Sequence, residues 1–261
     1  MTTLPELSGK VALITGASRG IGYGIAEALV ARGDRVCITG RNEDALKEAV
    51  DRLAAAAPDA EGQPRVIGVA GKAHDEAHQA EVVERTMEAF GRVDYLANNA
   101  GTNPVFGPLA ELDLGVARKV FETNVVSALG FAQQTWRAWQ SENGGAIVNI
   151  ASVAGLAPSP FIGAYGVSKA AMINLTQQLA HEYAPRVRVN AIAPAVVKTK
   201  FAQALYEGRE EEAAAAYPLG RLGVPSDIGG AAAFLTSQQS DWVTGQTLVV
   251  DGGIFLNAGV E

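Results

Sequence analysis

The stretch KVALITGASRGIG, residues 10–22, runs from a short apolar segment through a glycine loop into an Ala-rich segment with helical periodicity. Gly16, Gly20 and Gly22 stand in a T-G-x-x-x-G-x-G arrangement that begins at Thr15. Glycines let the backbone approach a pyrophosphate, and the amino end of the helix adds amide donors and a favourable dipole. A strand, loop and helix at the start of an alternating pattern therefore predict a dinucleotide site.

The same alternation continues along the whole chain. Short apolar runs predict seven strands: KVALIT, RVCIT, RVIGVA, VDYLANN, AIVNIAS, VRVNAIA and TLVVDGG. The stretches between them predict helices near 21–32, 42–56, 75–90, 112–139, 165–183 and 225–237. Strands separated by helices pair in parallel, and near-continuous apolar strands imply a sheet covered on both faces. The sequence therefore predicts a single Rossmann-type, doubly wound α/β domain over 1–261, with a seven-stranded parallel sheet.

Composition and charge narrow the possible partners. With 21 basic and 28 acidic residues the formal net charge is −7, which opposes binding to nucleic acid or to an anionic membrane surface. Cys37 is the only cysteine, so no intramolecular disulfide can form, which fits a reducing compartment. No apolar run approaches the ~18 residues that span a bilayer, and the N-terminus lacks a signal-peptide pattern. We therefore expect a cytoplasmic protein.

Residues suited to chemistry follow the predicted strands. The first, fourth, fifth and sixth strands are followed by Gly16, Asn98, Ser152 and Pro194. In doubly wound sheets, ligands bind at these carboxyl ends. The longest irregular insertion, near 195–220, also follows a strand and contains the charged run EGREEE beside AAAA. It predicts a solvated helical flap or, in the functional interpretation, a substrate lid.

The end of the second strand bears on cofactor choice. A dinucleotide site usually has an acid about twenty residues beyond the glycine loop, where it binds the adenosine ribose. Here the strand ends Thr39-Gly40-Arg41-Asn42, with no acid before Glu43. Arg41 and Arg19 can instead offer guanidinium groups to a 2′-phosphate, unless both are ordinary exposed charges. We therefore predict NADP(H) rather than NAD(H).

Tyr165 and Lys169 lie four residues apart in a predicted helix, thirteen residues beyond Ser152. On a helix, residues i and i+4 share a face, so a phenol and an ammonium point at the same small volume. That geometry suits a proton donor with a neighbouring cation.

These motifs occur in a fixed order. They are Thr15-Gly16-x-x-x-Gly20-x-Gly22, Asn98-Asn99-Ala100-Gly101, Asn124, Ser152 and Tyr165-x-x-x-Lys169. In this combination, from about Lys10 to Gly253, the chain resembles the short-chain dehydrogenase/reductase family. The segments 103–108 (NPVFGP) and 157–160 (APSP) further resemble NADPH-dependent carbonyl and retinal reductases, which are close to the 3-oxoacyl reductases.

The resemblance implies four catalytic residues. Tyr165 would protonate the developing alkoxide as a hydride leaves the nicotinamide, or act as a base in the reverse direction. Lys169 would lower the phenol pKa from ~10 by ~1 to 3 units and hold the nicotinamide ribose. Ser152 would hydrogen-bond the substrate oxygen, and Asn124 would hold a water in a relay from Lys169 to solvent.

The resemblance also implies a cofactor cleft. Besides Tyr165 and Lys169, its expected contacts are Gly16, Ser18, Arg19, Gly20, Ile21, Gly22, Arg41, Asn98, Ala100, Gly101, Pro194, Val197 and Thr199. Two positions depart from the family pattern: Lys72 stands where an Asp usually contacts the adenine, and Ala195 where a Gly usually follows Pro194. No metal site is predicted.

The leading hypothesis is an NADP(H)-dependent oxidoreductase that transfers a hydride between nicotinamide and an apolar ketone or aldehyde, or the corresponding alcohol. The residues that either line its substrate side or pack in the core and lid are Phe106, Leu156, Phe161, Phe201, Leu205 and Tyr206. One alternative is a reductase of 3-oxoacyl thioesters of carrier protein or coenzyme A, for which Lys198 and Lys200 are the candidate basic patch. Another is a non-catalytic NADP sensor, which the intact Ser152, Tyr165 and Lys169 oppose.

The resemblance implies a homotetramer or dimer as well. One interface would involve the helices around Asn124 and Tyr165, and another the TLVVDGG end.

Overall fold

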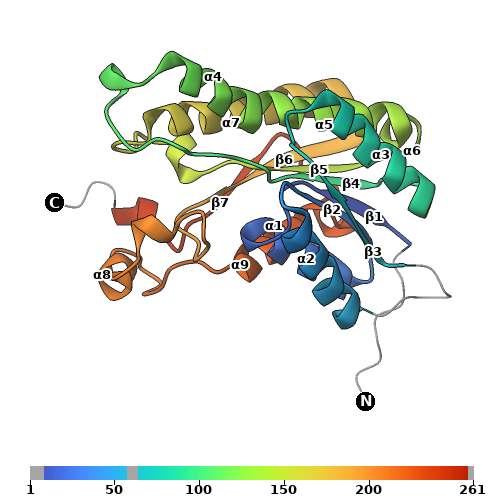
Figure 1. The fold of residues 1–261 in the computed structure, drawn as a ribbon, viewed down its shortest axis with the longest axis horizontal. Helices are drawn as coiled ribbons and strands as arrows, with labels where there is room; N and C mark the ends of the chain where they lie inside the picture. The colour runs from blue at the N-terminus through green and yellow to red at the C-terminus, as the bar shows by residue number, and fades with distance from the viewer. Residues whose placement is uncertain (1–8, 58–63, 258–261) are drawn as a thin grey trace.

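A computed structural model describes residues 9–57 and 64–257, which form a seven-stranded sheet in the order β3-β2-β1-β4-β5-β6-β7 (Figure 1). The strands are β1 Val11–Ile14, β2 Arg35–Gly40, β3 Val66–Ala70, β4 Tyr95–Asn98, β5 Gly145–Ile150, β6 Val187–Pro194 and β7 Thr247–Val250. Every neighbouring pair is parallel. The winding reverses between β1 and β4, so the carboxyl ends of these strands frame a crevice suited to a ligand. The predicted doubly wound sheet is confirmed.

Helices cover both faces of the sheet. They are α1 Gly20–Arg32, α2 Glu43–Ala56, α3 Glu76–Phe90, α4 Leu114–Phe121, α5 Ser127–Thr135, α6 Ser141–Asn143, α7 Gly163–Tyr183, α8 Glu210–Ala215 and α9 Pro225–Leu235. Figure 1 shows α1, α2 and α9 on one face, and α3, α5, α6 and α7 on the other. The sheet is thus buried on both sides, as the apolar strands predict.

The structure corrects the prediction of a single helix near 112–139. It begins at Leu114, because the Asp113 carboxylate accepts a hydrogen bond from the Val116 amide at 2.9 Å and caps the first turn. π-helical turns interrupt it at Glu122–Val126 and Trp136–Gln140. Each such turn inserts one residue into the helix and leaves backbone groups out of the regular ladder, and such turns occur often at functional sites.

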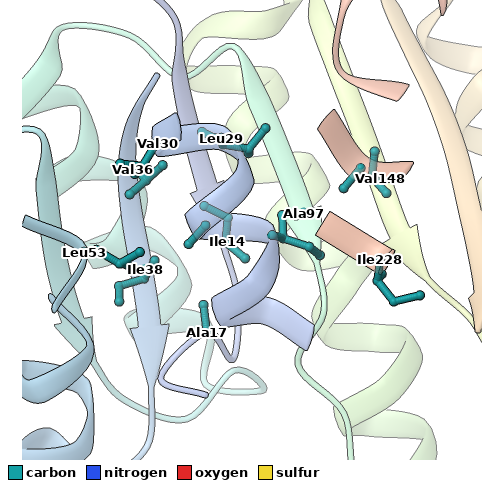
Figure 2. Close-up of a cluster of buried hydrophobic side chains, with 14 of the residues drawn as sticks. Ile14, Ala17, Leu29, Val30, Val36, Ile38, Leu53, Ala97, Val148 and Ile228 are labelled. Atoms are coloured by element: carbon teal, nitrogen blue, oxygen red, sulfur yellow. The ribbon is translucent and has the colours of Figure 1, made fainter. Parts of the chain in front are cut away.

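The core on one face of the sheet packs around α1. Figure 2 shows Ile14 and Ile38 of the strands against Leu29 of α1, with Ile228 of α9 beyond them. All four side chains are buried, and each contributes about 1.5–3 kcal/mol to folding by leaving water. This packing holds the amino end of α1, and with it the glycine loop, at the carboxyl edge of the sheet.

The insertion after β6 contains the expected helical segment. A 3₁₀ turn at Gln203–Leu205 and the exposed helix α8 form most of it, away from the sheet (Figure 1). The Lys198 ammonium pairs with the Glu210 carboxylate at 3.0 Å, and the Tyr206 hydroxyl donates to the Thr199 carbonyl at 3.2 Å. These contacts attach the segment to the strand end. Its use as a lid stays a prediction.

Candidate active site

The glycine loop packs tightly against the segment after β4. Gly16 has φ +63°, and a Cβ built on it would lie 2.9 Å from the Ala100 Cα. A Cβ on Gly22 would lie 2.5 Å from the Asn99 side-chain nitrogen. Both positions therefore require glycine for close approach, and Gly16 also for its left-handed backbone.

Two residues that the sequence interpretation did not place in the site hold these segments together. The Thr15 hydroxyl accepts hydrogen bonds from the Asn99 and Ala100 amides, both at 3.0 Å. The Asn99 side chain donates to the Thr15 and Gly16 carbonyls, both at 2.9 Å. Thr15 and Asn99 were visible in the quoted motifs, but only the fold shows that they bond to each other. These hydrogen bonds hold the glycine loop against the segment that follows β4, at the base of the crevice.

The side chain of Asn98 is used in the interior of the protein. It is buried and donates to the Ala128 carbonyl at 3.2 Å and to the Asn149 side chain at 2.9 Å. Asn149 in turn donates to the Thr176 hydroxyl of α7 at 2.9 Å. Successive strand residues point to opposite faces, and this one points toward the α5 and α7 layer. Its side chain therefore joins the sheet to those helices, and only its backbone remains available to a cofactor.

Ser152 and Tyr165 meet at the carboxyl end of β5. Ser152 caps the 3₁₀ turn Val153–Gly155, and its hydroxyl accepts from the Ala154 amide at 3.2 Å. Tyr165 lies in the first turn of α7, and the Ser152 side chain lies close enough to lower the pKa of its phenol by hydrogen bonding. The two hydroxyls therefore face one volume.

Lys169 lies one helical turn beyond Tyr165. Its Nζ is 5.5 Å from the centre of the Tyr165 ring and donates to the Ile150 carbonyl at 2.7 Å. The side chain is buried, and burial lowers the pKa of the ammonium to about 8. The cation is thus held by the end of β5 and is close to losing its proton at mildly alkaline pH.

The expected lowering of the Tyr165 pKa is wrong for this structure. Burial raises the pKa of the phenol to about 12, and the hydrogen bond with Ser152 lowers it by less. Removing the phenolate from water costs more than the hydrogen bond with Ser152 recovers. The phenol is therefore protonated across the physiological range, which suits a proton donor.

Asn124 lies within the first π-helical turn and is fully buried. Its side-chain oxygen accepts from the Thr102 amide at 2.7 Å, while its nitrogen donates to the Thr102 carbonyl and the Ser168 hydroxyl, both at 3.0 Å. A Cβ built on Gly101 would lie 3.4 Å from the Asn124 oxygen and 3.7 Å from the Lys169 Nζ. Glycine at 101 therefore leaves open the space beside Lys169. That cradle fits a group such as a ribose.

Two arginines with unpaired side chains lie where the glycine loop meets the end of β2, which we call the outer end of the crevice. Arg19 and Arg41 are exposed, and neither side chain makes a hydrogen bond or ion pair with the described residues. Ser18 lies against the end of β2, since a Cβ on Gly40 would lie 3.1 Å from its Cβ. The side chain of Asn42 is used to cap α2, where it accepts from the Ala45 amide at 2.7 Å. No carboxylate therefore occupies the end of β2, and the donors present fit a phosphate.

The other wall of the crevice comes from the segment after β6. Pro194 ends that strand, Val197 is buried and bridges to Gly223, and Thr199 faces the glycine loop. A Cβ on Gly20 would lie 3.2 Å from the Thr199 methyl carbon. Ile21, next in the loop, is half-buried and packs against the core beneath. The two sides of the crevice thus approach each other across Gly20.

The two departures from the family pattern cause no visible strain. Ala195 lines a cavity of about 200 Å³ together with Tyr217 and Asp251. Phe161 is the one non-glycine residue with positive φ in the described chain, so Ala195 has an ordinary backbone. Lys72 is exposed beyond β3. The effect of Lys72 and Ala195 on cofactor binding stays a prediction.

Large exposed apolar side chains follow the strand ends near the mouth of the crevice, and Phe161 and Phe201 lie near Tyr165. The Phe106 and Phe161 rings lie 5.1 Å apart, and the Phe201 ring lies 6.1 Å from that of Tyr165. Leu156 and Leu205 are also exposed, and all five come from segments that follow β4, β5 and β6. Exposed apolar residues gathered beside polar catalytic groups are typical of a substrate pocket.

In the described residues, no group of three or more His, Cys, Asp or Glu side chains is arranged to hold a metal ion. Within the same residues, no helix combines the length and the hydropathy needed to cross a bilayer.

Comparisons with known proteins agree with this geometry. The profile of the family described as Enoyl-(Acyl carrier protein) reductase matches residues 16–255. The chain is 38% identical over 255 residues to "Dehydrogenase/reductase SDR family member 4" of Caenorhabditis elegans, covering 95% of this chain and 96% of the relative. It is 35% identical to "Tropinone reductase-like 3" of Erythroxylum coca, covering 95% and 94%.

Solved structures give the same answer. A short-chain type dehydrogenase/reductase from Mycobacterium ulcerans superimposes with a TM-score of 0.89 at 33% identity, covering 97% of this chain and 92% of that one. A protein titled "Short-chain dehydrogenase/reductase SDR:Glucose/ribitol dehydrogenase" from Brucella melitensis gives 0.87 at 30% identity, covering 97% and 99%. With the seven-stranded parallel sheet, these matches over almost the whole length mean that the chain belongs to the short-chain dehydrogenase/reductase family of oxidoreductases.

Proposed function

We propose that this protein is an NADP(H)-preferring carbonyl reductase or alcohol dehydrogenase that acts on apolar ketones and aldehydes or on their alcohols. The observation that supports it most is the meeting of Ser152, Tyr165 and Lys169 at one strand end, below a mouth of exposed apolar side chains. When bound, the nicotinamide supplies or accepts the hydride. The residues of the chain bind the substrate, orient it and move its proton.

In the direction of reduction, the Tyr165 phenol donates its proton to the substrate oxygen as that oxygen gains charge. A phenol that stays protonated up to about pH 12 is available for this step at neutral pH. The Ser152 hydroxyl donates a hydrogen bond to the same oxygen and stabilises the developing charge. In oxidation, Tyr165 would accept the proton instead.

Lys169 would hold the nicotinamide ribose and stabilise the phenolate left on Tyr165 after proton transfer. Its buried ammonium lies beside the open space at Gly101, so it can contact a sugar hydroxyl without leaving the Tyr165 ring. Asn124, next to it, would hold a water that returns a proton from solvent. A cation in a dry site stabilises a nearby anion more strongly than one in water.

The preference for NADP(H) is supported by the outer end of the crevice. Arg19 and Arg41 are exposed and unpaired within the described chain, and Asn42 is committed to the cap of α2. Guanidinium groups bind a phosphate through charge-assisted, often bidentate hydrogen bonds. A ribose without the 2′-phosphate would lack the carboxylate that usually binds its hydroxyls.

The thioester alternative has less support. Its candidate basic patch is reduced because Lys198 is paired with Glu210, which leaves Lys200 as the exposed amine beside the mouth. The apolar side chains at Phe106, Phe161 and Phe201 fit a compact hydrophobic carbonyl compound better than a phosphate-bearing arm. We keep the cytoplasm as the expected compartment.

A homotetramer or dimer remains part of this proposal. Val126 at the end of the π-helical turn and Val167 on α7 are more than half exposed, and Leu248 and Val249 of the edge strand β7 are partly exposed. Apolar groups on a helix layer and on a sheet edge favour association with a second copy. Light scattering on the purified protein would measure the assembly.

The direct test is a panel of aryl and alkyl ketones, aldehydes and 3-oxoacyl thioesters, assayed by consumption of NADPH and of NADH. We expect the highest kcat/KM for an apolar ketone or aldehyde with NADPH. Faster turnover of the thioesters would favour the alternative, and no turnover with any carbonyl compound would reject the proposed reaction.

A further inference from the structure

The hydroxyl of Ser168, which lies between Tyr165 and Lys169 on α7, makes two hydrogen bonds. The side chain is fully buried. Its Oγ donates to the Tyr165 main-chain carbonyl at 2.7 Å and accepts from the Asn124 Nδ2 at 3.0 Å. The hydroxyl therefore links the π-helical turn of Asn124 to the first turn of α7, two segments that lie more than forty residues apart in sequence.

The first of these bonds is ordinary, because buried serines in helices often donate to a carbonyl three or four residues back. The second bond, from the Asn124 amide, is not needed to satisfy the hydroxyl of a buried helical serine. A hydroxyl that donates in one direction and accepts in the other forms a polarised chain, here from the Asn124 amide through Ser168 to the Tyr165 carbonyl.

The other atoms of the Asn124 carboxamide are already committed to Thr102. The oxygen accepts from the Thr102 amide and the nitrogen donates its other hydrogen to the Thr102 carbonyl. Thr102 follows Gly101, where the open space beside the Lys169 Nζ lies. One carboxamide therefore joins the segment after β4 to α7, and Ser168 provides the α7 end of that link.

We propose that Ser168 is a positioning residue that holds the Asn124 carboxamide against the helical turn carrying Tyr165 and Lys169. In the reaction proposed above, on which its kinetic consequence rests, this fixes the distance between Lys169 and the segment at Gly101. Without the hydroxyl, the amide hydrogen of Asn124 is left buried and unpaired, and the π-helical turn can shift away from α7.

Ser127 offers a matched control. It is also a buried serine in a helix, and its hydroxyl donates to the Thr123 carbonyl four residues back at 2.7 Å. In the described structure no hydrogen bond joins that hydroxyl to α7 or to the Asn124 carboxamide. Ser127→Ala and Ser168→Ala thus remove the same kind of group and the same kind of helix bond, and they differ in the contact with Asn124.

The test measures both variants with the wild type in three ways. We expect Ser168→Ala to lower kcat about tenfold, the effect of one lost buried hydrogen bond, while the dissociation constant for NADPH changes less than about twofold. The side-chain amide protons of Asn124, followed by NMR hydrogen exchange, should exchange at least about tenfold faster. Ser127→Ala should leave kcat and that exchange rate within about twofold of wild type. Ser168→Thr, which keeps the hydroxyl, should restore slow exchange.

Equal losses of kcat and equal exchange rates in the two alanine variants, at matched melting temperatures, would overturn the proposal. The exchange measurement needs no turnover. If the wild type reduces no carbonyl compound, the proposed function fails while the role of Ser168 is still decided by the Asn124 protons.

Discussion

The two ends of the crevice differ in how far their ionisable groups are exposed to solvent. At the inner end, beside β5 and α7, Lys169 is buried and Tyr165 is partly buried, and burial shifts both pKa values, to about 8 and about 12. At the outer end, Arg19 and Arg41 are exposed and unpaired within the described chain. Proton transfer benefits from a dry site with fixed geometry, whereas a phosphate can be captured by solvated groups that remain free until it arrives.

The largest effect should come from the inner end. Tyr165→Phe keeps the ring but removes the proton donor, so we expect carbonyl reduction to fall by at least about 10²-fold. Binding of NADPH, measured by fluorescence titration, should change less than about twofold. Tyr183→Phe is the matched control, because Tyr183 is a buried tyrosine on the same helix that stacks on Trp136. Undiminished turnover in Tyr165→Phe would reject the mechanism.

The pH dependence of kcat should report on Lys169. Its folded pKa of about 8 means that the ammonium, and with it the charge that stabilises the Tyr165 phenolate, is lost as the pH rises through 8. We expect kcat for reduction to fall above pH 8, approaching tenfold per pH unit. A flat profile from pH 7 to 10 would contradict this role.

A rise in pH should increase the contribution of Lys169 to stability, although it should lower kcat. The Lys169 pKa is lowered in the folded protein, so between about pH 8 and 10.5 the unfolded chain binds more protons than the folded one. Its contribution to stability therefore rises with pH across that window. Urea unfolding at pH 8 and pH 10, compared between wild type and Lys169→Met, isolates this contribution, and the slope with pH should be smaller in the variant.

The outer end should respond through cofactor affinity. Arg41→Ala removes one charge-assisted contact with a 2′-phosphate, and we expect the KM for NADPH to rise about 10-fold or more while the KM for NADH is unchanged. Arg52→Ala is the control, since Arg52 lies on α2 and stacks on Tyr23 instead of facing the crevice end. Equal effects of Arg41→Ala on the two cofactors would remove the basis for the NADP(H) preference.

The smallest effect concerns the apolar mouth beside Tyr165. Phe161 has φ +65°, which costs a non-glycine residue about 1–2 kcal/mol. Phe161→Gly and Phe161→Ala both remove the ring and should raise the KM for aryl ketones a few-fold. The glycine variant relieves the strain, so denaturant unfolding should find it more stable than the alanine variant by about 1 kcal/mol. An unchanged KM in both would place the substrate elsewhere.

The sequence predicted best what depends on local pattern. The seven strands, the glycine loop and the pairing of Tyr165 with Lys169 follow from short-range periodicity, and the structure agrees with each. The helix near 112–139 was predicted without its two π-helical turns, because an apolar period cannot show one inserted residue. The motif likewise did not show that the Asn98 side chain bonds to Ala128 and Asn149, because those partners lie far away in sequence.

The sequence by itself determined the order of elements, the family and the identity of the groups available for proton transfer, because these depend on residue type and spacing. Tertiary structure alone decided the environment of those groups. Burial raised the Tyr165 pKa where spacing suggested a lower one, and packing joined Asn124 to Ser168 across two distant segments. The physical reason is that desolvation and long-range hydrogen bonds depend on what surrounds a side chain, which no stretch of sequence contains.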